Sequence, residues 1–247
     1  MTLRSGVIMK EIKITEASKY VYEFSADETI NFAVSQDCEI VIRAYNSKLN
    51  LNFFLTNVTV KIHYLLEDKV NIKQQWQLKN SQLDIRKLCL ADRVVINNKI
   101  MLDQSTLNLQ HKGFVKKRAK GATKIVHQTS NATSQVACLL VGVKGANIDM
   151  LLDSHVKKHC RDTVATQKIK VIALNEKINV NMQPILRTDH HQITAQHAAV
   201  FSQITADEIY YLQSRGLSEK QAKELIIKSL LLSGNEPYYE KIEELKL

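Results

Sequence analysis

Apolar and polar side chains alternate one by one through most of the first 200 residues. The clearest stretch is residues 58–63, VTVKIH, and the pattern recurs at residues 49–53, 70–72, 83–85, 107–109, 169–171 and 178–182. Alternation with a period of two indicates a β-strand that buries one face. Many short strands at intervals of about ten residues predict a sandwich, a barrel or a solenoid.

The residues between these strands help to choose among the three folds. Asn-Gly and Asp-Gly pairs, the usual hairpin turns, are absent, and the chain has seven glycines and two prolines. Polar clusters stand at the joints instead, at residues 46–48, 67–69, 79–81, 97–99 and 175–177. Such clusters turn a corner without a tight hairpin. They favour a solenoid of parallel strands, a β-helix, with a sandwich as the alternative.

The pattern changes after about residue 204, and the C-terminal segment predicts three helices. Thr205 and Glu208 have the spacing of a capping box, which opens a helix that ends at Gly216. Ser218 and Gln221 have the same spacing before a second helix, which ends near residue 234. Its apolar spacing runs through Ala222, Leu225, Ile226, Ser229 and Leu230.

A third helix is predicted from Pro237 to about residue 245, with Tyr238, Ile242 and Leu245 on one stripe. The sequence therefore divides into a mainly β domain over residues 1–204 and a helical domain over residues 205–247.

Composition and motifs exclude several classes of protein. No window approaches 18 consecutive apolar residues, and the N-terminus lacks the apolar core of a secretory signal, so we expect a cytoplasmic protein. The four cysteines form no CxxC pair, which excludes a zinc ribbon, and in a reducing compartment they are expected to stay free. Motifs of P-loop, dinucleotide-binding, zinc-protease and serine-hydrolase sites are absent, so no enzyme activity is predicted.

The net charge of +9, from 34 basic and 25 acidic residues, favours an acidic partner. The densest basic run covers residues 112–120 and contains a single aromatic residue, Phe114. A basic β-solenoid that binds nucleic acid is therefore an alternative function. A continuous basic face with aromatic residues would support nucleic-acid binding, whereas dispersed charges would not.

Histidines are the candidate metal ligands. His155, His159 and Cys160 lie close together in sequence, but Lys157 and Lys158 would repel a cation there, so we interpret the two histidines as residues of a polar loop or strand edge. His190 and His191 are interpreted as surface residues. His197 lies within an alternating stretch, and the pattern leaves open whether it is a core-edge residue or a ligand.

Residues 197–222, HAAVFSQITADEIYYLQSRGLSEKQA, carry the most specific pattern in the chain. This stretch resembles, without gaps, the C-terminal signature of the SufB/SufD family: a histidine-bearing last strand, an acidic and aromatic helix, then Ser-Arg-Gly and an apolar helix. Residues 184–186 and 193–197 also resemble the last rungs of that family, and residues 127–134 resemble another of its rungs, H-x-x-P-x-x-x-S. The resemblance is strong from about residue 120 to residue 232 and weak before that.

The resemblance implies a right-handed parallel β-helix with C-terminal helices, in a non-catalytic scaffold for iron–sulfur cluster assembly. It further implies pairing with a SufB-like subunit through the last rungs and docking of a SufC-like ABC-type ATPase on the tail. A homodimer that uses the same rungs is an alternative for the isolated chain. The implied ATPase-docking residues are Tyr210, Tyr211, Leu212, Ser214, Arg215, Gly216, Leu217, Leu225 and Ile226.

Departures from the family pattern indicate which subunit the chain resembles. SufB carries a cysteine on a rung where residues 167–171 read QKIKV, and a glutamate after the signature histidine where this chain has Ala198. A cluster ligand needs a thiolate, an imidazole or a carboxylate, and neither Ile169 nor Ala198 offers one. The chain therefore resembles SufD, with His197 as the one implied cluster ligand. We expect the isolated chain to bind no cofactor stably and the complex to hold a cluster transiently.

Overall fold

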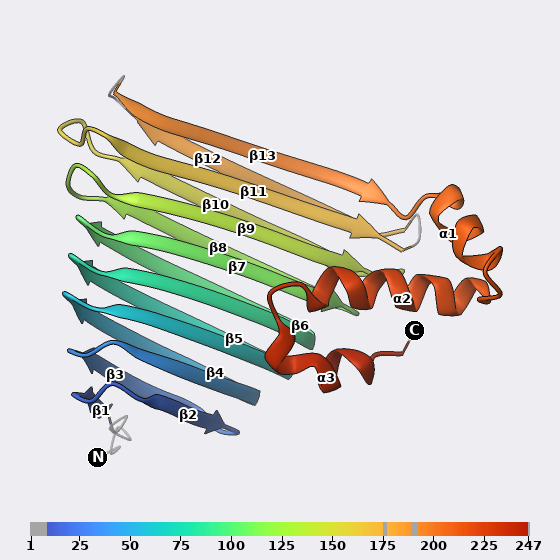
Figure 1. The fold of residues 1–247 in the computed structure, drawn as a ribbon, viewed down its shortest axis with the longest axis horizontal. Coiled ribbons are helices and arrows are strands. Elements are labelled where there is room, and N and C mark those ends of the chain that lie inside the picture. The colour runs from blue at the N-terminus through green and yellow to red at the C-terminus, as the bar shows by residue number, and fades with distance from the viewer. Residues whose placement is uncertain (1–8, 175–176, 189–191, 247) are drawn as a thin grey trace, which may run out of the picture.

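The structure is a computed structural model that describes residues 9–174, 177–188 and 192–246. Parallel strands stacked in rungs make up its body (Figure 1). In chain order the strands are β1 (Met9–Ile14), β2 (Lys19–Phe24), β3 (Glu28–Val34), β4 (Cys38–Thr56), β5 (Thr59–Lys79), β6 (Gln82–Asp103), β7 (Thr106–Val115), β8 (Arg118–His127), β9 (Thr133–Gly142), β10 (Asn147–Val156), β11 (Thr163–Ala173), β12 (Asn179–Thr188) and β13 (Ile193–Gln203).

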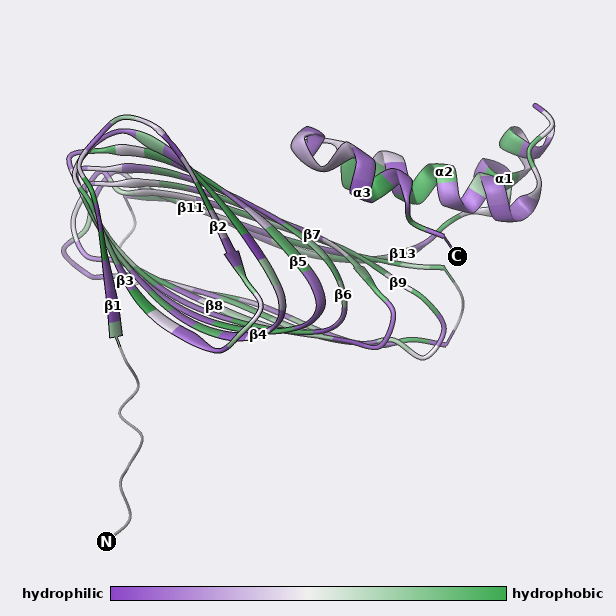
Figure 2. Cartoon of the chain, turned by 90° about the horizontal axis from the view of Figure 1, so that it is seen from below, coloured by the Kyte–Doolittle hydropathy of each residue, from purple (hydrophilic) through white to green (hydrophobic). Residues whose placement is uncertain are grey.

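The strands form two layers. Face A consists of β2, the first halves of β4, β5 and β6, and then β7, β9, β11 and β13. Face B consists of β1, β3, the second halves of the same long strands, and then β8, β10 and β12. Every pairing within a face is parallel, and the chain returns to each face once per rung (Figure 2). The fold is thus a parallel β-solenoid, which confirms the predicted mainly β solenoid over the sandwich.

The core lies between the two faces, where equivalent positions of successive rungs stack on one another. On face B, Phe32 pairs in register with Phe53, and Phe53 pairs with Trp76. Their rings are stacked, with centroids 4.6 Å apart for the first pair and 4.0 Å for the second, and all three are fully buried. The inward residues of most other strands are aliphatic, so the alternating sequence pattern corresponds to the buried face of each strand.

Polar residues with positive φ turn the corners between the faces. At one corner lie Asn46 (φ 47°) and Asp68 (φ 61°), and at the other lie Asn57, Asn80 and Gln104. Asn and Asp tolerate this left-handed region better than other residues with side chains. The predicted corners at residues 46–48, 67–69 and 79–81 therefore hold, but residues 97–99 lie on face B, past the corner of β6 that precedes Arg93. They fail as a corner because Asn98 is an inward, hydrogen-bonded residue; residues 175 and 176 of the last cluster lie outside the described residues.

The tail comprises α1 (Ala206–Gln213), α2 (Glu219–Leu232), a short 3-10 turn (Glu236–Tyr238) and α3 (Tyr239–Glu243). Both predicted capping boxes form, at Thr205 with Glu208 and at Ser218 with Gln221. Gly216 follows α1 with a φ of 90°, a backbone conformation that favours glycine. Within the described residues, no helix has the length and apolar character needed to cross a membrane.

The helices α2 and α3 pack on the outer side of face A (Figure 2). The buried residues of α2 are Ala222, Ile227 and Leu231. The predicted stripe holds at Ala222 and in part at Leu230, which packs against the same cluster, but it is wrong at Leu225 and Ser229, which are exposed because the packed face of α2 is rotated toward Ile227 and Leu231. For α3 the predicted stripe holds, since Tyr238 and Ile242 are buried.

The stacked aromatic column predicts a large effect of one substitution. Trp76→Ala should lower the free energy of unfolding by about 3–5 kcal/mol, because it removes a fully buried indole that stacks on Phe53. Urea unfolding followed by far-UV circular dichroism measures the change. Tryptophan fluorescence cannot be used for the comparison, because Trp76 is the single tryptophan and the variant lacks it. Gln75→Ala, at the neighbouring outward position, is the control and should change stability by less than about 0.5 kcal/mol. Equal effects of the two substitutions would contradict the proposed packing.

Candidate functional site

The last rung leaves one end of the solenoid open. Strand β12 pairs with β10 and β13 pairs with β11, and no described strand pairs with their other edges. No described residue of either strand is fully buried, and Ile185, Val200 and Phe201 are 37%, 39% and 51% exposed. Unpaired strand edges with apolar side chains are surfaces on which another chain can add strands. The last rung is thus an available pairing surface.

His197 lies on this rung, in the middle of β13. It pairs in register with Gln167 of β11 and lines a shallow polar groove on face A, together with Gln110, Gln135 and Lys168. Its side chain is exposed, with no hydrogen-bond or ion-pair partner among the described residues. Among the described residues that line the groove, His197 is the one with a metal-binding side chain. The imidazole is therefore free to bind a ligand from outside the chain.

The other histidines have different surroundings. His159 forms a hydrogen bond of 2.8 Å between its Nε2 and the carbonyl of Gln128, in the turn after β10, and His155 lies near the end of that strand. Cys160 is buried and its thiol donates to the carbonyl of His127. Within the described part of the chain, no three His, Cys, Asp or Glu side chains gather as a metal site. His190 and His191 lie outside the described residues.

The helix α1 contains no buried residue and presents its aromatic side chains to solvent. Tyr210 is 73% exposed and Tyr211 is 59% exposed, with the Arg215 guanidinium 5.5 Å from the ring centre of Tyr211. Leu225 of α2 is 49% exposed, on the side of that helix away from the solenoid. The remaining predicted docking residues are exposed or half-buried: Leu212, Ser214, Gly216, Leu217 and Ile226.

A separate set of residues anchors the tail. Ile227 and Leu231 of α2, with Tyr238 and Ile242, belong to one buried cluster with Leu65, Leu88, Phe114, Val141 and Ile172 of face A. Two hydrogen bonds add to this packing: Lys112 Nζ donates to the carbonyl of Leu230 at 2.6 Å, and Arg86 donates to that of Gly234 at 3.1 Å. The anchoring residues are thus distinct from the exposed ones, so the tail offers an apolar surface on a fixed support.

The basic run over residues 112–120 is dispersed. Lys112 binds the tail, and Lys116 lines a pocket beside α2 with Lys220 and Lys223. Lys117 pairs with Asp92, and Lys120 pairs with Asp149. The only aromatic residue of the run, Phe114, is buried. The run forms no continuous basic face with exposed aromatic residues, so this arrangement does not support nucleic-acid binding.

The sequence analysis did not predict a row of hydrogen-bonded polar residues inside the solenoid. Lys87 is fully buried; its Nζ donates to Gln74 and, at 3.0 Å, to Asn98, and it lies 4.9 Å above the ring centre of Tyr64. Asn98 donates onward to the Thr123 hydroxyl at 2.8 Å. Burial lowers the pKa of Lys87 to about 7, because the interior disfavours its charged form.

Two histidines are also buried, and burial lowers the pKa of each; His111 lies beside the polar row. Burial, reinforced by the nearby Lys87, lowers the pKa of His111 to about 3. His127 is also buried, 3.0 Å from the Ser134 hydroxyl, and burial lowers its pKa to about 4. The signal for all these residues was present in the sequence: Gln74, Asn98 and His111 occupy inward positions of otherwise apolar alternating stretches.

These features define the class of protein. The molecule is a parallel β-solenoid with an open last rung and an anchored helical tail that exposes aromatic side chains. The family model of the SufBD core domain of the SUF iron–sulfur cluster assembly system matches residues 17–230. The chain therefore belongs to the SufB/SufD family of iron–sulfur cluster assembly proteins.

Individual relatives are similar over shorter segments. The iron–sulfur cluster assembly protein SufD of Bacillus subtilis is 37% identical over 67 residues, which are 27% of this chain and 15% of the relative. A SufBD family protein of Synechocystis is 37% identical over 65 residues, 26% of this chain and 14% of the relative. A SufBD family protein of Staphylococcus aureus is 24% identical over 123 residues, 50% of this chain and 26% of the relative. The matched segments thus span about a seventh to a quarter of these relatives.

The buried histidines predict a loss of stability in acid. The unfolded chain titrates His127 near its ordinary pKa of about 6.5, and the folded chain near 4, so the unfolded state binds more protons between these values. The stability that neutral His127 contributes is present above pH 6.5 and is lost as the pH falls toward 4. His127→Gln should reduce the loss of unfolding free energy between pH 7 and pH 5 by about 2 kcal/mol.

Urea unfolding at a series of pH values measures this difference. A His127→Gln protein that loses as much stability as the wild type over the interval would contradict it.

Proposed function

We propose that the chain is a non-catalytic scaffold subunit of a SufBCD-type complex, which pairs with a SufB-like subunit and binds a SufC-like ATPase. The observation that carries the proposal is the division of the tail into two sets of residues. One set, around Ile227 and Leu231, is buried against face A, while Tyr210, Tyr211 and Leu225 are left exposed. Exposed aromatic and leucine side chains on a fixed support are typical of a surface that binds a partner.

The open edges of β12 and β13 support pairing with the second subunit. A SufB-like solenoid with its own open last rung would continue the two sheets across the interface, and Phe201 and Val200 would be covered there. A homodimer of the isolated chain would use the same edges. Light scattering of the chain alone and with the partner distinguishes the two assemblies.

In this assembly the iron–sulfur cluster is the cargo. His197 offers one imidazole, whereas a cluster bound by protein needs several thiolate or imidazole ligands. We therefore expect the other ligands from the SufB-like partner and no stable cluster on the isolated chain. Hydrolysis of ATP would come from the docked ATPase, and the assembly would work in the cytoplasm. The dispersed basic run gives no support to the nucleic-acid alternative.

The docking surface predicts an effect of two substitutions. Tyr211→Ala combined with Leu225→Ala should weaken binding of the SufC-like ATPase at least about tenfold, because both side chains are exposed and none of the anchoring residues is changed. Co-expression and pull-down, followed by calorimetric titration, measure the binding.

Tyr239→Ala is the matched control, since Tyr239 is an exposed tyrosine (53%) on α3 of the same tail. It should leave the affinity within about twofold of the wild type. If the Tyr211 and Leu225 double variant binds the ATPase as tightly as the wild type does, the docking surface lies elsewhere.

The proposed ligand role of His197 predicts that its substitution lowers the cluster content of the complex. His197→Ala should reduce the iron and sulfide content after cluster assembly by about half or more, because one ligand is removed while the exposed position tolerates alanine. His197→Cys should restore part of the content, since a thiolate also binds iron. Gln196→Ala, the adjacent residue of β13, is the control. An unchanged iron content in the His197→Ala complex would rule out the ligand role.

A further inference from the structure

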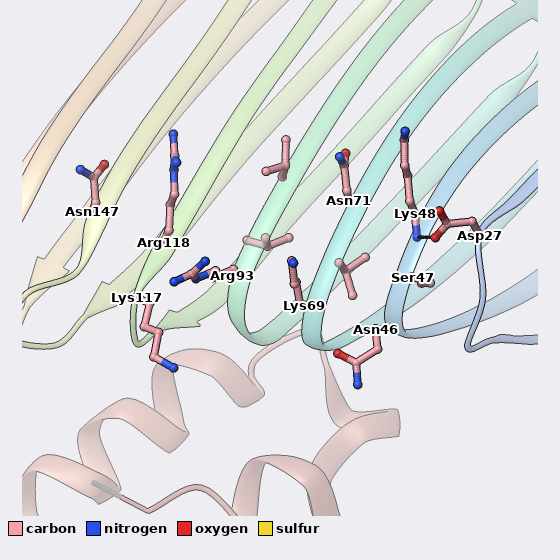
Figure 3. Close-up of a pocket in the computed structure, with 13 residues that line it drawn as sticks. Asp27, Asn46, Ser47, Lys48, Lys69, Asn71, Arg93, Lys117, Arg118 and Asn147 are labelled. Atoms are coloured by element: carbon pink, nitrogen blue, oxygen red, sulfur yellow. Dashed lines mark hydrogen bonds between the residues drawn. The ribbon is translucent and has the colours of Figure 1, made fainter.

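Three cations stack on consecutive rungs at the corner where face A ends and face B begins. Lys69 pairs in register with Arg93, and Arg93 pairs with Arg118. Neighbouring strands lie about 4.8 Å apart, so the three residues form a short, straight row, the cation row. All three are exposed and line one groove, which Figure 3 shows from outside the corner.

The cation row has little interaction with carboxylates: Arg93 contributes to the lowered pKa of the neighbouring Asp92, but less than Lys117 and Lys116 do. None of its three residues takes part in an ion pair within the described part of the chain. Asp68 directly precedes Lys69, and Asp92 directly precedes Arg93. These two aspartates have other partners: Asp92 pairs with Lys117 at 2.6 Å, and Asp68 accepts a hydrogen bond from Asn46. Like charges opposite one another on neighbouring strands are destabilising, so a bound anion would relieve a repulsion that the fold itself creates.

Other groups around the row are also suited to an anion. Lys48 lies on the adjoining rung, and its backbone N–H holds Asp27, the one carboxylate of the groove, at 2.8 Å. The amides of Asn71 and Asn147 line the same groove (Figure 3). Amide and ammonium groups add donors beside the two guanidinium groups, which bind oxyanions in a bidentate manner.

The lining of the groove indicates a compact ligand. It contains no aromatic residue on which a base could stack, which argues against a nucleic acid. Its apolar residues are three valines, of which Val70 and Val94 are buried beneath the charges, so an apolar anchor of a protein partner would find no pocket. A dense row of cations without these features matches a small anion with several adjacent charges.

We propose that the cation row binds an oligophosphate, either as a free inorganic chain or as the phosphate portion of a nucleotide. The site lies on the corner, whereas the proposed pairing surface lies on the last rung and the docking surface on the tail. The proposal therefore does not depend on the scaffold role.

Calorimetric titration of the full chain with inorganic triphosphate at low ionic strength tests the site. We expect saturable binding that weakens as salt is added. Arg93→Gln combined with Arg118→Gln should weaken binding at least about tenfold, because both bidentate groups are lost.

Lys99→Gln combined with Lys124→Gln is the matched control. These exposed residues also pair in register on β6 and β8, so the variant removes the same charge from the same strands. They lie six residues further along each strand, about 20 Å from the row. This control should bind triphosphate within about twofold of the wild type.

Titrations with ATP and with adenosine separate the two sources of phosphate. Equal affinity for ATP and triphosphate would assign the site to the phosphate chain alone, and tighter binding of ATP would assign it to a nucleotide; adenosine should not bind in either case. Three outcomes would overturn the proposal: no saturable binding of triphosphate or ATP, equal weakening by the two double variants, or tighter binding of a single-stranded oligonucleotide or an acidic peptide through the same arginines.

Discussion

Parallel register is the constraint on which the rest of this structure depends. Each rung places its inward side chains directly over those of the rung before, so every inward position becomes a column that runs along the solenoid. The column of Phe32, Phe53 and Trp76 shows the benefit, because three flat rings stack without a gap. The same rule applies to polar residues: Gln74 and Asn98 pair in register on face B, and this places both where they accept hydrogen bonds from Lys87 of face A.

The repeat also determines where the chain can bind other molecules. A solenoid buries its strand edges along its length and leaves them open at its ends. The last rung of this chain therefore has free edges and half-buried residues, although its sequence alternates like that of the rungs before it. The outer side of face A carries a second apolar surface, which α2 and α3 cover, and their position leaves α1 exposed.

The sequence predicted the fold to a large extent because a repeated local pattern encodes it. Period-two alternation specified the strands, polar clusters specified most corners, and two capping boxes specified the starts of α1 and α2. The failures have physical reasons. Residues 97–99 resemble a corner, but Asn98 has its partners inside the solenoid. The stripe on α2 was right at Ala222 and wrong at Leu225, because leucines and isoleucines occur all around that helix and only the surface opposite it selects the packed face.

By itself the sequence determined the strand pattern, the helical tail, the family resemblance and the identity of the candidate ligand His197, because each of these depends on residues close together in the chain. Only the tertiary structure decided which tail residues are anchors and which are exposed. It also decided that the basic run is dispersed, while Lys69, Arg93 and Arg118, each more than 20 residues apart, form one row. The reason is that parallel register brings together residues that are one rung apart in the chain. The number of residues in a rung follows from the closed path of the chain around its core rather than from any local sequence signal.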